Sequence, residues 1–245
     1  MSRLLYQFPL SLYCEKARWV LDHKGLDYQC VDLWPGMHLP RARWMTGAST
    51  LPILKDSGRA FTDSSNIALH LEHNYPDKPL LPSNVVQRRK VLELDAYFDE
   101  FGVHARRLAW SHAVDDDNVD RFFFGFDGYS NLARRAGRMS KRLLRRMIRQ
   151  RFQVYPDRVT ASLGCVRAGV TYLETLLRDN PGGYLVGNSF TLADLTAASM
   201  LATQVGPYGS PWHEVHGGYP DSPDRRALRE SIAGKWLMRI YASYR

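Results

Sequence analysis

Long apolar runs and a cysteine framework are both missing from this chain of 245 residues. No apolar stretch approaches the roughly 20 residues of a membrane-spanning helix, and the N-terminus lacks the pattern of a signal peptide. The three cysteines, Cys14, Cys30 and Cys165, have neither the density of a disulfide framework nor the spacing of a metal site. We therefore expect a cytoplasmic protein in a reducing compartment, with no metal centre and no membrane association.

Acidic residues are scarce in one segment, which makes the charge uneven. The net charge is +8, and residues 121–151 hold ten Lys and Arg against Asp127 alone. We interpret the basic run at 134–151 first as a solvated helix face. The alternatives are attraction of an anionic substrate or a membrane surface, and contact with nucleic acid. No aromatic residues interleave with it in a stacking pattern, so we expect no nucleic-acid partner.

The remaining composition, 44% hydrophobic and 24% charged, is that of an ordinary globular protein. The first eighty residues alternate between strand and helix patterns. Expected strands lie at 3–8, 28–33, 49–54 and 59–62. Expected helices lie at 14–24, at 39–45 (helical or irregular) and from 63 onward.

Beyond the proline-dense segment 76–82, almost every pattern favours helix. The expected helices are 85–110, 131–152, 157–179 and 225–244, with a loop at 206–223. Their apolar stripes are Leu92, Ala96, Phe98 and Phe101 on one helix, and Leu132, Ala136, Met139, Leu143 and Met147 on the next. We predict an α/β domain at 1–76, a linker at 77–86 and an all-helical domain at 87–245.

Ser11 lies where the first strand ends and the first helix begins. The unpaired N–H groups and the positive dipole end of a helix favour an anion at that point. A hydroxyl there can stabilise a neighbouring thiolate. The structural alternative is that Ser11 only caps the helix, as serine commonly does.

Four motifs in order resemble the glutathione S-transferase superfamily, over essentially the whole chain. Residues 11–18 (SLYCEKAR) resemble its serine-type S-P-Y-[SC]-x-K-[VA]-R element, theta- or zeta-like, with Leu12 in place of the usual proline. Residues 50–54 (TLPIL) resemble its x-V-P-x-L loop, and residues 63–68 (DSSNIA) resemble its [ED]-S-x-A-I element. Residues 187–194 (GNSFTLAD) resemble its signature in the helical domain, where Thr191 and Asp194 have the spacing of a reciprocal helix cap.

The resemblance implies a thioredoxin-like α/β N-terminal domain, an all-α C-terminal domain and a glutathione site. Ser11 would support the glutathione thiolate, and Pro52 would be cis. The residues implied to hold the tripeptide are His38, Leu51, Pro52, Asp63 and Ser64. Tyr6, Tyr13 and Cys14 stay open as alternatives to Ser11 for the group nearest the sulfur. An acceptor-substrate site is predicted from Tyr13, Tyr97, Phe101, His104, Trp110 and Tyr208.

We therefore expect a glutathione transferase that activates the thiol and conjugates it to a small electrophilic, largely apolar substrate. Glutathione is the co-substrate, and a homodimer is expected from the resemblance alone. Two alternatives remain open. One is a binding or interaction protein of this fold without turnover, which the loss of proline at Leu12 makes credible. The other is a glutathione-dependent dehalogenase, etherase or reductase.

Overall fold

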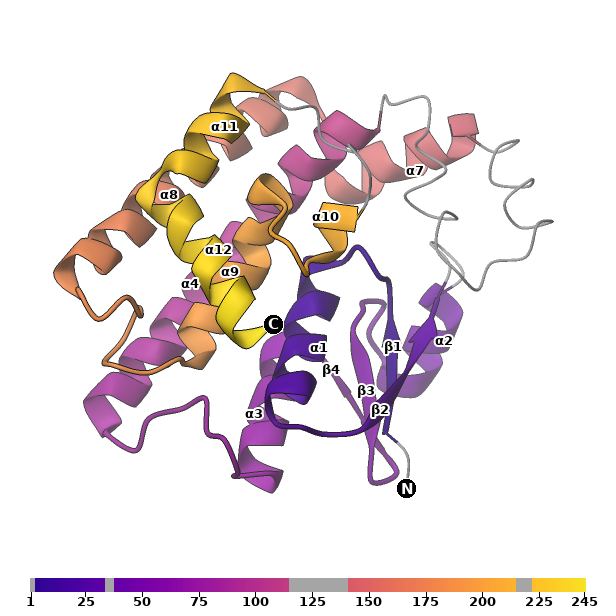
Figure 1. The fold of residues 1–245 in the computed structure, drawn as a ribbon. Helices are drawn as coiled ribbons and strands as arrows, with labels where there is room; N and C mark the ends of the chain where they lie inside the picture. The colour runs from indigo at the N-terminus through magenta and orange to yellow at the C-terminus, as the bar shows by residue number, and fades with distance from the viewer. Residues whose placement is uncertain (1–2, 34–37, 115–140, 215–221) are drawn as a thin grey trace.

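The structure is a computed structural model that describes residues 3–33, 38–114, 141–214 and 222–245. A four-stranded sheet lies at the N-terminal end and helices form the rest (Figure 1). The strands are β1 (Arg3–Gln7), β2 (Tyr28–Asp32), β3 (Ile53–Asp56) and β4 (Arg59–Thr62). Their order is β2-β1-β3-β4, with β1 and β2 parallel and the other pairs antiparallel. The predicted α/β layout is confirmed.

Helices cover both faces of the sheet because neighbouring residues of β1 point to opposite sides. Leu5 joins the main core with residues of α1 (Leu12–His23) and α3 (Ser64–Asn74). Tyr6 faces the other way and packs with Ala42 of α2 (His38–Thr46). The Ser11 turn and the start of α3 therefore belong to the same side of the sheet.

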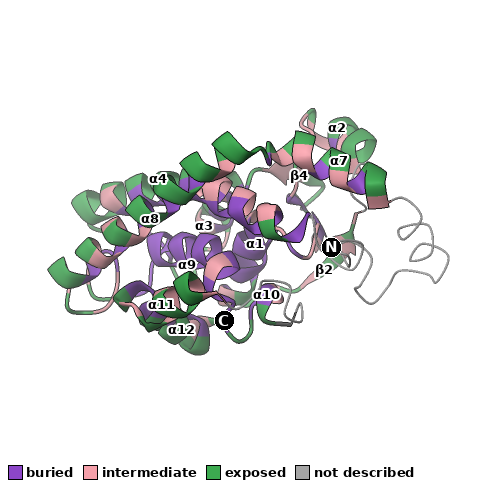
Figure 2. Ribbon diagram, turned by 90° about the horizontal axis from the view of Figure 1, so that it is seen from above, coloured by how far each residue is buried: buried purple, intermediate pink, exposed green. Residues whose placement is uncertain are grey.

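The second half of the chain is a helical layer against α1 and α3 (Figure 1). It contains α4 (Val85–Ala113), α7 (Lys141–Phe152), α8 (Pro156–Asp179), α9 (Leu192–Val205), α10 (Pro211–Glu214), α11 (Pro223–Glu230) and α12 (Ile232–Tyr244). Helix α9 is the centre of this layer, since every residue except Gln204 is buried (Figure 2). It packs against α4, α1 and α12.

The start of α9 has the predicted reciprocal cap. The Thr191 backbone N–H donates to Asp194 Oδ2 at 2.9 Å, and the Thr191 hydroxyl donates to the same oxygen at 2.8 Å. The Leu185 backbone N–H donates to Asp194 Oδ1 at 2.8 Å. Burial raises the pKa of Asp194 to about 6, although these hydrogen bonds pull it down. The cap fixes the entry of the most buried helix.

One predicted helix face is partly wrong and another is shifted. On α4, Phe98 and Phe101 are buried as predicted, but Leu92 and Ala96 are exposed and the buried face continues through Leu94 and Val91. On α7 the buried residues are Leu144 and Ile148, and the predicted Leu143 and Met147 are exposed. The other predicted stripe positions, Leu132, Ala136 and Met139, lie outside the described residues. A stripe of apolar residues only suggests a face, and the neighbouring helix decides which residues it covers.

The C-terminal region also differs from the prediction. Residues 206–223 were expected as a loop, but α10 lies within them. The helix expected at 225–244 is two helices, because Ser231 ends α11 and caps α12 by accepting from the Gly234 backbone N–H. In the described ranges, no helix combines the length and apolar character needed to cross a membrane. The domain boundary at residue 76 stays a prediction.

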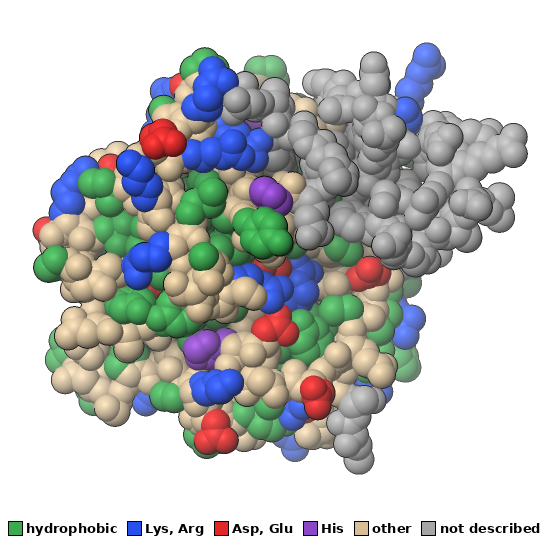
Figure 3. Space-filling view, in the orientation of Figure 1, with side chains coloured by type: hydrophobic (Ala, Val, Ile, Leu, Met, Phe, Trp, Pro, Cys, Tyr) green, Lys and Arg blue, Asp and Glu red, His purple; other side chains and the backbone are tan. Residues whose placement is uncertain are grey.

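Positive and negative side chains are interspersed on the face shown in Figure 3. Of the basic run at 134–151, the part before Lys141 lies outside the described residues. Within α7, Arg142 and Arg146 are exposed, as expected for a solvated helix face. Arg145 is half-buried and donates from Nε to the Val114 carbonyl at 3.0 Å.

Candidate active site

Ser11 is the N-cap of α1, in the turn that follows β1. Its backbone is extended (φ −84°, ψ 122°), and its Oγ accepts a hydrogen bond from the Cys14 backbone N–H at 3.4 Å. The bond is long, and the Ser11 side chain also hydrogen-bonds the Cys14 thiol, which partly opposes the effect of burial on the pKa of that thiol. Ser11 is half-buried at the positive end of the helix dipole. An anion at this turn would meet a hydroxyl donor and a helix N-terminus together.

Arg18 of the same motif holds this turn in place from inside α1. Its Nη2 donates to the Pro9 carbonyl at 3.0 Å and to Glu15 Oε2 at 2.6 Å. Arg245 donates from Nε to the other oxygen of Glu15 at 2.7 Å. Burial would raise the pKa of Glu15, but the two guanidinium groups hold it below its usual range. The motif therefore supplies both Ser11 and the ion pairs that support it.

Three other groups were candidates for the position nearest a bound sulfur. Cys14 has no exposed surface, and burial raises the pKa of its thiol, so it is a poor thiolate. Tyr6 packs under α2, with the Arg41 guanidinium 4.9 Å from its ring centroid. Tyr13 donates its hydroxyl proton to the Asp99 carbonyl at 2.9 Å. Of these groups, only Ser11 combines partial exposure with a place at the N-terminus of α1 and a hydroxyl that no described backbone carbonyl accepts from.

The peptide bond between Leu51 and Pro52 is cis, as predicted. Pairing of β3 with β1 begins at Ile53, so the backbone N–H and C=O of Leu51 lie outside the ladder. Leu51 is half-buried. An extended peptide beside this residue could therefore pair with its backbone.

Asp63 caps α3 in an unusual conformation. Its φ of 72° lies in the left-handed region that residues other than glycine rarely adopt. One oxygen, Oδ1, accepts from the Ser65 and Asn66 backbone N–H groups at 3.0 Å each. Asp63 therefore acts as a helix cap through Oδ1. Its second oxygen, Oδ2, makes no hydrogen bond to a described residue and could bind a ligand. Strained backbone of this kind clusters at functional sites.

Ser64 follows Asp63 at the start of α3. Its hydroxyl is buried and has no hydrogen-bond partner among the residues that the structure describes. A buried polar atom without a partner is costly, so it marks a place where a ligand atom would be favourable. His38 is half-buried as the first residue of α2, on the other face of the sheet.

A buried polar cluster, which the sequence analysis did not predict, connects the first turns of α1 and α3 to α4 and α9. Lys16 Nζ contacts Asp95 Oδ1 at 2.7 Å, Asp99 Oδ1 at 2.9 Å and Ser65 Oγ at 2.7 Å. The Thr196 hydroxyl donates to Asp95 Oδ1 at 2.5 Å. We call these five residues the Lys16 cluster. It ties α1, α3, α4 and α9 together, which fixes the Ser11 turn relative to Asp63 and Ser64.

The chain matches two family models. The model described as Glutathione S-transferase, N-terminal domain, matches residues 5–79, and the model described as Glutathione S-transferase, C-terminal domain, matches residues 156–214. The chain belongs to the glutathione S-transferase superfamily. The thioredoxin-like domain plus helical domain of that superfamily is the fold described above.

The individual members of the superfamily that match this chain have low sequence identity to it. Glutathione S-transferase 1 of Dianthus caryophyllus is 25% identical over 208 residues, which covers 84% of this chain and 78% of the relative. A solved glutathione S-transferase of Ceriporiopsis subvermispora in complex with glutathione is 18% identical, with a TM-score of 0.65 and coverage of 100% and 98%. The β-etherase LigF of Sphingobium sp. strain SYK-6 is 19% identical, with a TM-score of 0.62 and coverage of 98% and 99%.

Three of the predicted acceptor residues point away from Ser11 in this glutathione S-transferase fold. Tyr97 packs edge-on against Tyr172 of α8, with ring centroids 4.8 Å apart. Phe101 occupies the space left by Gly169 of α8, where a Cβ would approach its ring to 2.4 Å. His104 forms a hydrogen bond with Ser162 Oγ at 3.1 Å. The expectation that these three side chains face Ser11 is therefore wrong, because they form the α4–α8 contact.

The α4 face that meets α1 carries other residues. Gly102 allows close approach, since a Cβ there would lie 3.1 Å from Tyr13 Oη. The Arg106 guanidinium carbon lies 5.3 Å from the Tyr13 ring centroid and 5.1 Å from that of Phe152. Phe152 stacks in turn on Trp110, with ring centroids 5.3 Å apart. We call Tyr13, Arg106, Phe152 and Trp110 the Arg106 stack; it keeps two of the predicted acceptor residues and adds two.

Tyr208, another predicted acceptor residue, follows α9, with 81% of its surface exposed and its ring edge-on to His213. Among the described residues, no group of three or more His, Cys, Asp or Glu side chains could hold a metal ion. His70, one of the histidines at helical spacing, stacks on Phe61 and bonds Asp56 instead.

Proposed function

We propose that this protein is a glutathione transferase that activates the thiol at Ser11 and joins its sulfur to a small electrophile. The observation that carries the proposal is the half-buried Ser11 hydroxyl at the N-terminus of α1, beside the Cys14 thiol. A free thiol with a pKa near 8.5 is mostly protonated at neutral pH. Lowering that pKa by roughly two units corresponds to about 2.7 kcal/mol, which a hydroxyl donor and a helix dipole can supply together.

The tripeptide would lie across three segments. Asp63 Oδ2 and the Ser64 hydroxyl would bind the ammonium and carboxylate of the γ-glutamyl group. The backbone of Leu51, next to cis-Pro52, would pair with the cysteinyl residue. His38 would meet the glycine carboxylate. The orphaned Ser64 hydroxyl and the unused Asp63 oxygen support this assignment, since each lacks a partner that the ligand would provide.

In the reaction, the thiol loses its proton to solvent and the thiolate attacks the electrophilic carbon. The new carbon–sulfur bond forms as the leaving group departs with its bonding electrons. Ser11 would donate its hydrogen bond to the sulfur throughout the approach. The apolar rings of the Arg106 stack, which begins at Tyr13 two residues after Ser11, would accept the largely apolar body of the substrate.

Replacement of Ser11 tests the thiol activation. Ser11→Ala should raise the pKa of the bound thiol and lower kcat roughly 10- to 100-fold at neutral pH, with the affinity for glutathione changed by less than about twofold. Ser11→Thr keeps a hydroxyl and should restore part of the activity. The thiolate absorbance of the binary complex, titrated with pH, measures the shift directly. Unchanged absorbance and activity in Ser11→Ala would remove Ser11 from the mechanism.

Asp63 can be tested against a matched cap. Asn84 caps α4 with the same hydrogen-bond pattern, its Oδ1 accepting from the Val86 and Gln87 backbone N–H groups at 3.0 Å. Asp63→Asn keeps a capping side chain and removes the charge, so glutathione affinity should fall about tenfold. Asn84→Ala should cost about 1 kcal/mol of stability and leave the affinity unchanged. Equal glutathione affinity in Asp63→Asn and the wild type would contradict the γ-glutamyl site.

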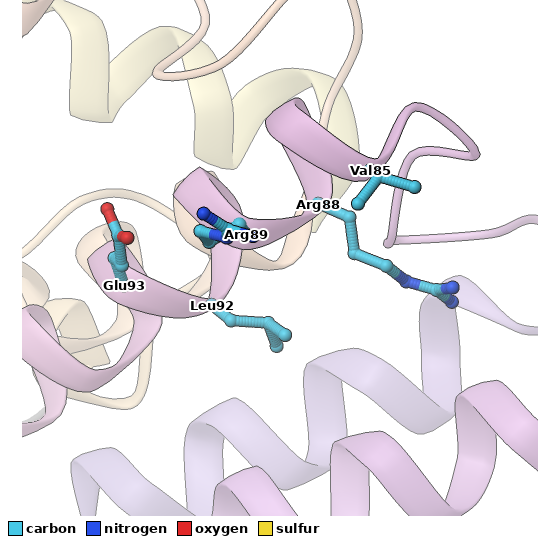
Figure 4. Close-up of a pocket in the computed structure, with 5 residues that line it drawn as sticks. All are labelled: Val85, Arg88, Arg89, Leu92 and Glu93. Atoms are coloured by element: carbon cyan, nitrogen blue, oxygen red, sulfur yellow. The ribbon is translucent and has the colours of Figure 1, made fainter.

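A homodimer is part of this proposal, and an exposed apolar surface on α3 and α4 supports it. Leu69, Val85, Val86 and Leu92 are exposed there. The start of α4 borders a shallow hollow of about 490 Å³ lined by Val85, Arg88, Arg89, Leu92 and Glu93 (Figure 4). Val86→Glu should convert a dimer to a monomer in sedimentation analysis. Leu163→Glu, at an exposed apolar position on α8, is the control that should leave the mass unchanged.

Product analysis separates the transfer from its alternatives. Incubation with glutathione and a panel of chlorinated aromatics, aryl ethers and disulfides should yield the thioether conjugate. Release of free halide without a stable conjugate would favour dehalogenation, cleavage of the aryl ethers would favour an etherase, and reduced disulfide would favour a reductase. Retention on immobilised glutathione with no product from any of them would favour a binding protein without turnover.

A further inference from the structure

Arg106 differs from the other charged residues around the candidate site. It lies on the α4 face toward α1, half-buried, with Tyr13 on one side of its guanidinium and Phe152 on the other. Both rings lie within the distance at which a cation interacts with an aromatic face. The two rings hold the side chain in place without using its hydrogen-bond donors.

No described residue forms a hydrogen bond or an ion pair with Arg106. The charged groups that act on it most are Arg151 and Arg107, which have the same sign. Burial and these two neighbours lower the pKa of its guanidinium, against the opposing effect of Tyr13. An arginine still stays protonated in proteins, so the charge persists and its donors are unsatisfied on the protein side.

The neighbouring Arg107 shows that the fold can satisfy an arginine at this depth. Arg107 donates from Nε to the Phe152 carbonyl at 3.1 Å and from Nη1 to Ser162 Oγ at 2.6 Å. Arg106, one position earlier on the same helix, faces the opposite interface and has no such acceptors among the described residues. A partly buried cation without a counter-ion is costly unless an anion binds it.

The location of Arg106 connects it to the candidate reaction site. Tyr13 is two residues beyond Ser11, in the first turn of α1, and its hydroxyl is fixed by the Asp99 carbonyl. Gly102, one turn before Arg106 on α4, brings the two helices into close contact. The guanidinium therefore lies beside the ring of Tyr13, two residues after Ser11, and beside the ring of Phe152, which stacks on Trp110.

We propose that the acceptor substrate carries a carboxylate, which Arg106 binds while its apolar body lies against the aromatic rings. The inference rests on the proposed function and names its substrate class: small electrophiles with an anionic group at the end remote from the reacting carbon. The carboxylate takes no part in bond making. Its role is to place the electrophilic carbon at the sulfur, and a planar guanidinium matches a carboxylate with two parallel hydrogen bonds.

Binding of product analogues tests the proposal without turnover. The probes are S-(4-carboxybenzyl)glutathione, S-(4-carbamoylbenzyl)glutathione and S-benzylglutathione, titrated calorimetrically. The first two share size and shape and differ in charge. The wild type should bind the carboxylate about 10- to 100-fold more tightly than the carboxamide, as expected for a charge-assisted hydrogen bond. Arg106→Gln should reduce this ratio to within about twofold, and Arg106→Lys should retain part of it.

Arg151→Gln is the matched control. It removes the same charge from an exposed residue whose guanidinium carbon lies 5.9 Å from the same Phe152 ring. The carboxylate preference should stay within about twofold of the wild type, because exposed charges at this separation are screened. An equal loss in Arg151→Gln and Arg106→Gln would show a diffuse basic field, and it would overturn the assignment to Arg106.

Failure of this inference is distinguishable from failure of the proposed function. Wild-type protein that binds all three analogues equally would overturn the carboxylate preference and leave the glutathione site intact. Wild-type protein that binds none of them would overturn the proposed function and this inference with it. Arg106→Gln that keeps a tenfold preference would likewise remove Arg106 from substrate binding.

Discussion

Two cations lie between α1 and α4, and the protein balances them in opposite ways. Lys16 is fully buried, and two carboxylates and a hydroxyl lie within 2.9 Å of its Nζ. Arg106 is half-buried between two rings, and no acid among the described residues pairs with it. The difference indicates two roles. The Lys16 charge is neutralised within the fold and stabilises it, whereas the Arg106 charge remains available to a ligand.

The charge of Asp194 is compensated less fully than that of Lys16 and more fully than that of Arg106. Asp194 has a buried carboxyl that accepts three hydrogen bonds, and no cation pairs with it within the described part of the chain. Its pKa of about 6 reflects this, since hydrogen bonds alone do not offset the loss of water. Removal or titration of each charge should therefore have a different effect on stability.

The largest effect is expected at Lys16. Lys16→Met would leave Asp95 and Asp99 buried without their counter-ion, so the free energy of unfolding should fall by about 3–5 kcal/mol. Chemical denaturation followed by far-UV circular dichroism measures it. Lys90→Met is the control, because Lys90 is partly exposed on α4 and has one ion-pair contact among the described residues, at 4.0 Å to Glu93. A loss below about 1 kcal/mol at Lys16 would mean that the cluster is not structural.

A smaller effect should follow the titration of Asp194. The folded-state pKa of about 6 lies above the ordinary value near 3.9, so the folded protein binds this proton more tightly than the unfolded chain. The contribution to stability is present below about pH 4 and is lost as the pH rises through 6. Relative to Asp194→Asn, wild-type stability should fall by up to about 3 kcal/mol between pH 4 and 7. A pH-independent difference would contradict the raised pKa.

Thr196 contributes one hydrogen bond to the Lys16 cluster. Thr196→Val keeps the shape of the side chain and removes the donor to Asp95, so the loss should be about 2 kcal/mol. The exposed Thr171 on α8 bonds only its own helix backbone, and Thr171→Val should change stability by less than about 0.5 kcal/mol. Equal values for the two variants would show that the Asp95 carboxylate is satisfied without Thr196.

Arg106→Met should have the smallest effect on stability and the opposite sign. It removes a partly desolvated charge that has no counter-ion among the described residues, and it keeps an apolar chain between the two rings. The free energy of unfolding should stay unchanged or rise by up to about 1 kcal/mol. Thermal denaturation of Arg106→Met and Lys16→Met under the same conditions compares the stability change at the two cations directly. A loss of more than about 2 kcal/mol would show that Arg106 stabilises the fold and would weaken the distinction between the two cations.

Local sequence accounts for the elements of the site. The strand-to-helix turn at Ser11, the cap at Asp63 and the cap formed by Thr191 and Asp194 all rest on contacts between residues two to nine positions apart. Such contacts follow from residue type and spacing, which is why the motifs predicted them. The cis bond at Pro52 followed from the motif resemblance and is confirmed.

Contacts between distant segments were not predictable in the same way. Lys16 meets Asp95 and Asp99, 79 and 83 positions away, although the pair of acids one helical turn apart on α4 was a visible signal. Tyr97, Phe101 and His104 have the right residue types for a substrate site, but α8 covers them. Sequence periodicity gives the faces of a helix, and it does not say which neighbour each face will meet.

The sequence by itself determined the family, the α/β-then-helical order and the position of Ser11 at a helix start, because each depends on motifs and local hydrogen bonds. Only the tertiary structure decided which side of α4 faces that serine. The packing of α4 between α1 and α8 sends Tyr97 to one interface and Arg106 to the other. Whether a cation is neutralised or left available depends on the acids that this packing brings within reach, and no local spacing encodes that distance.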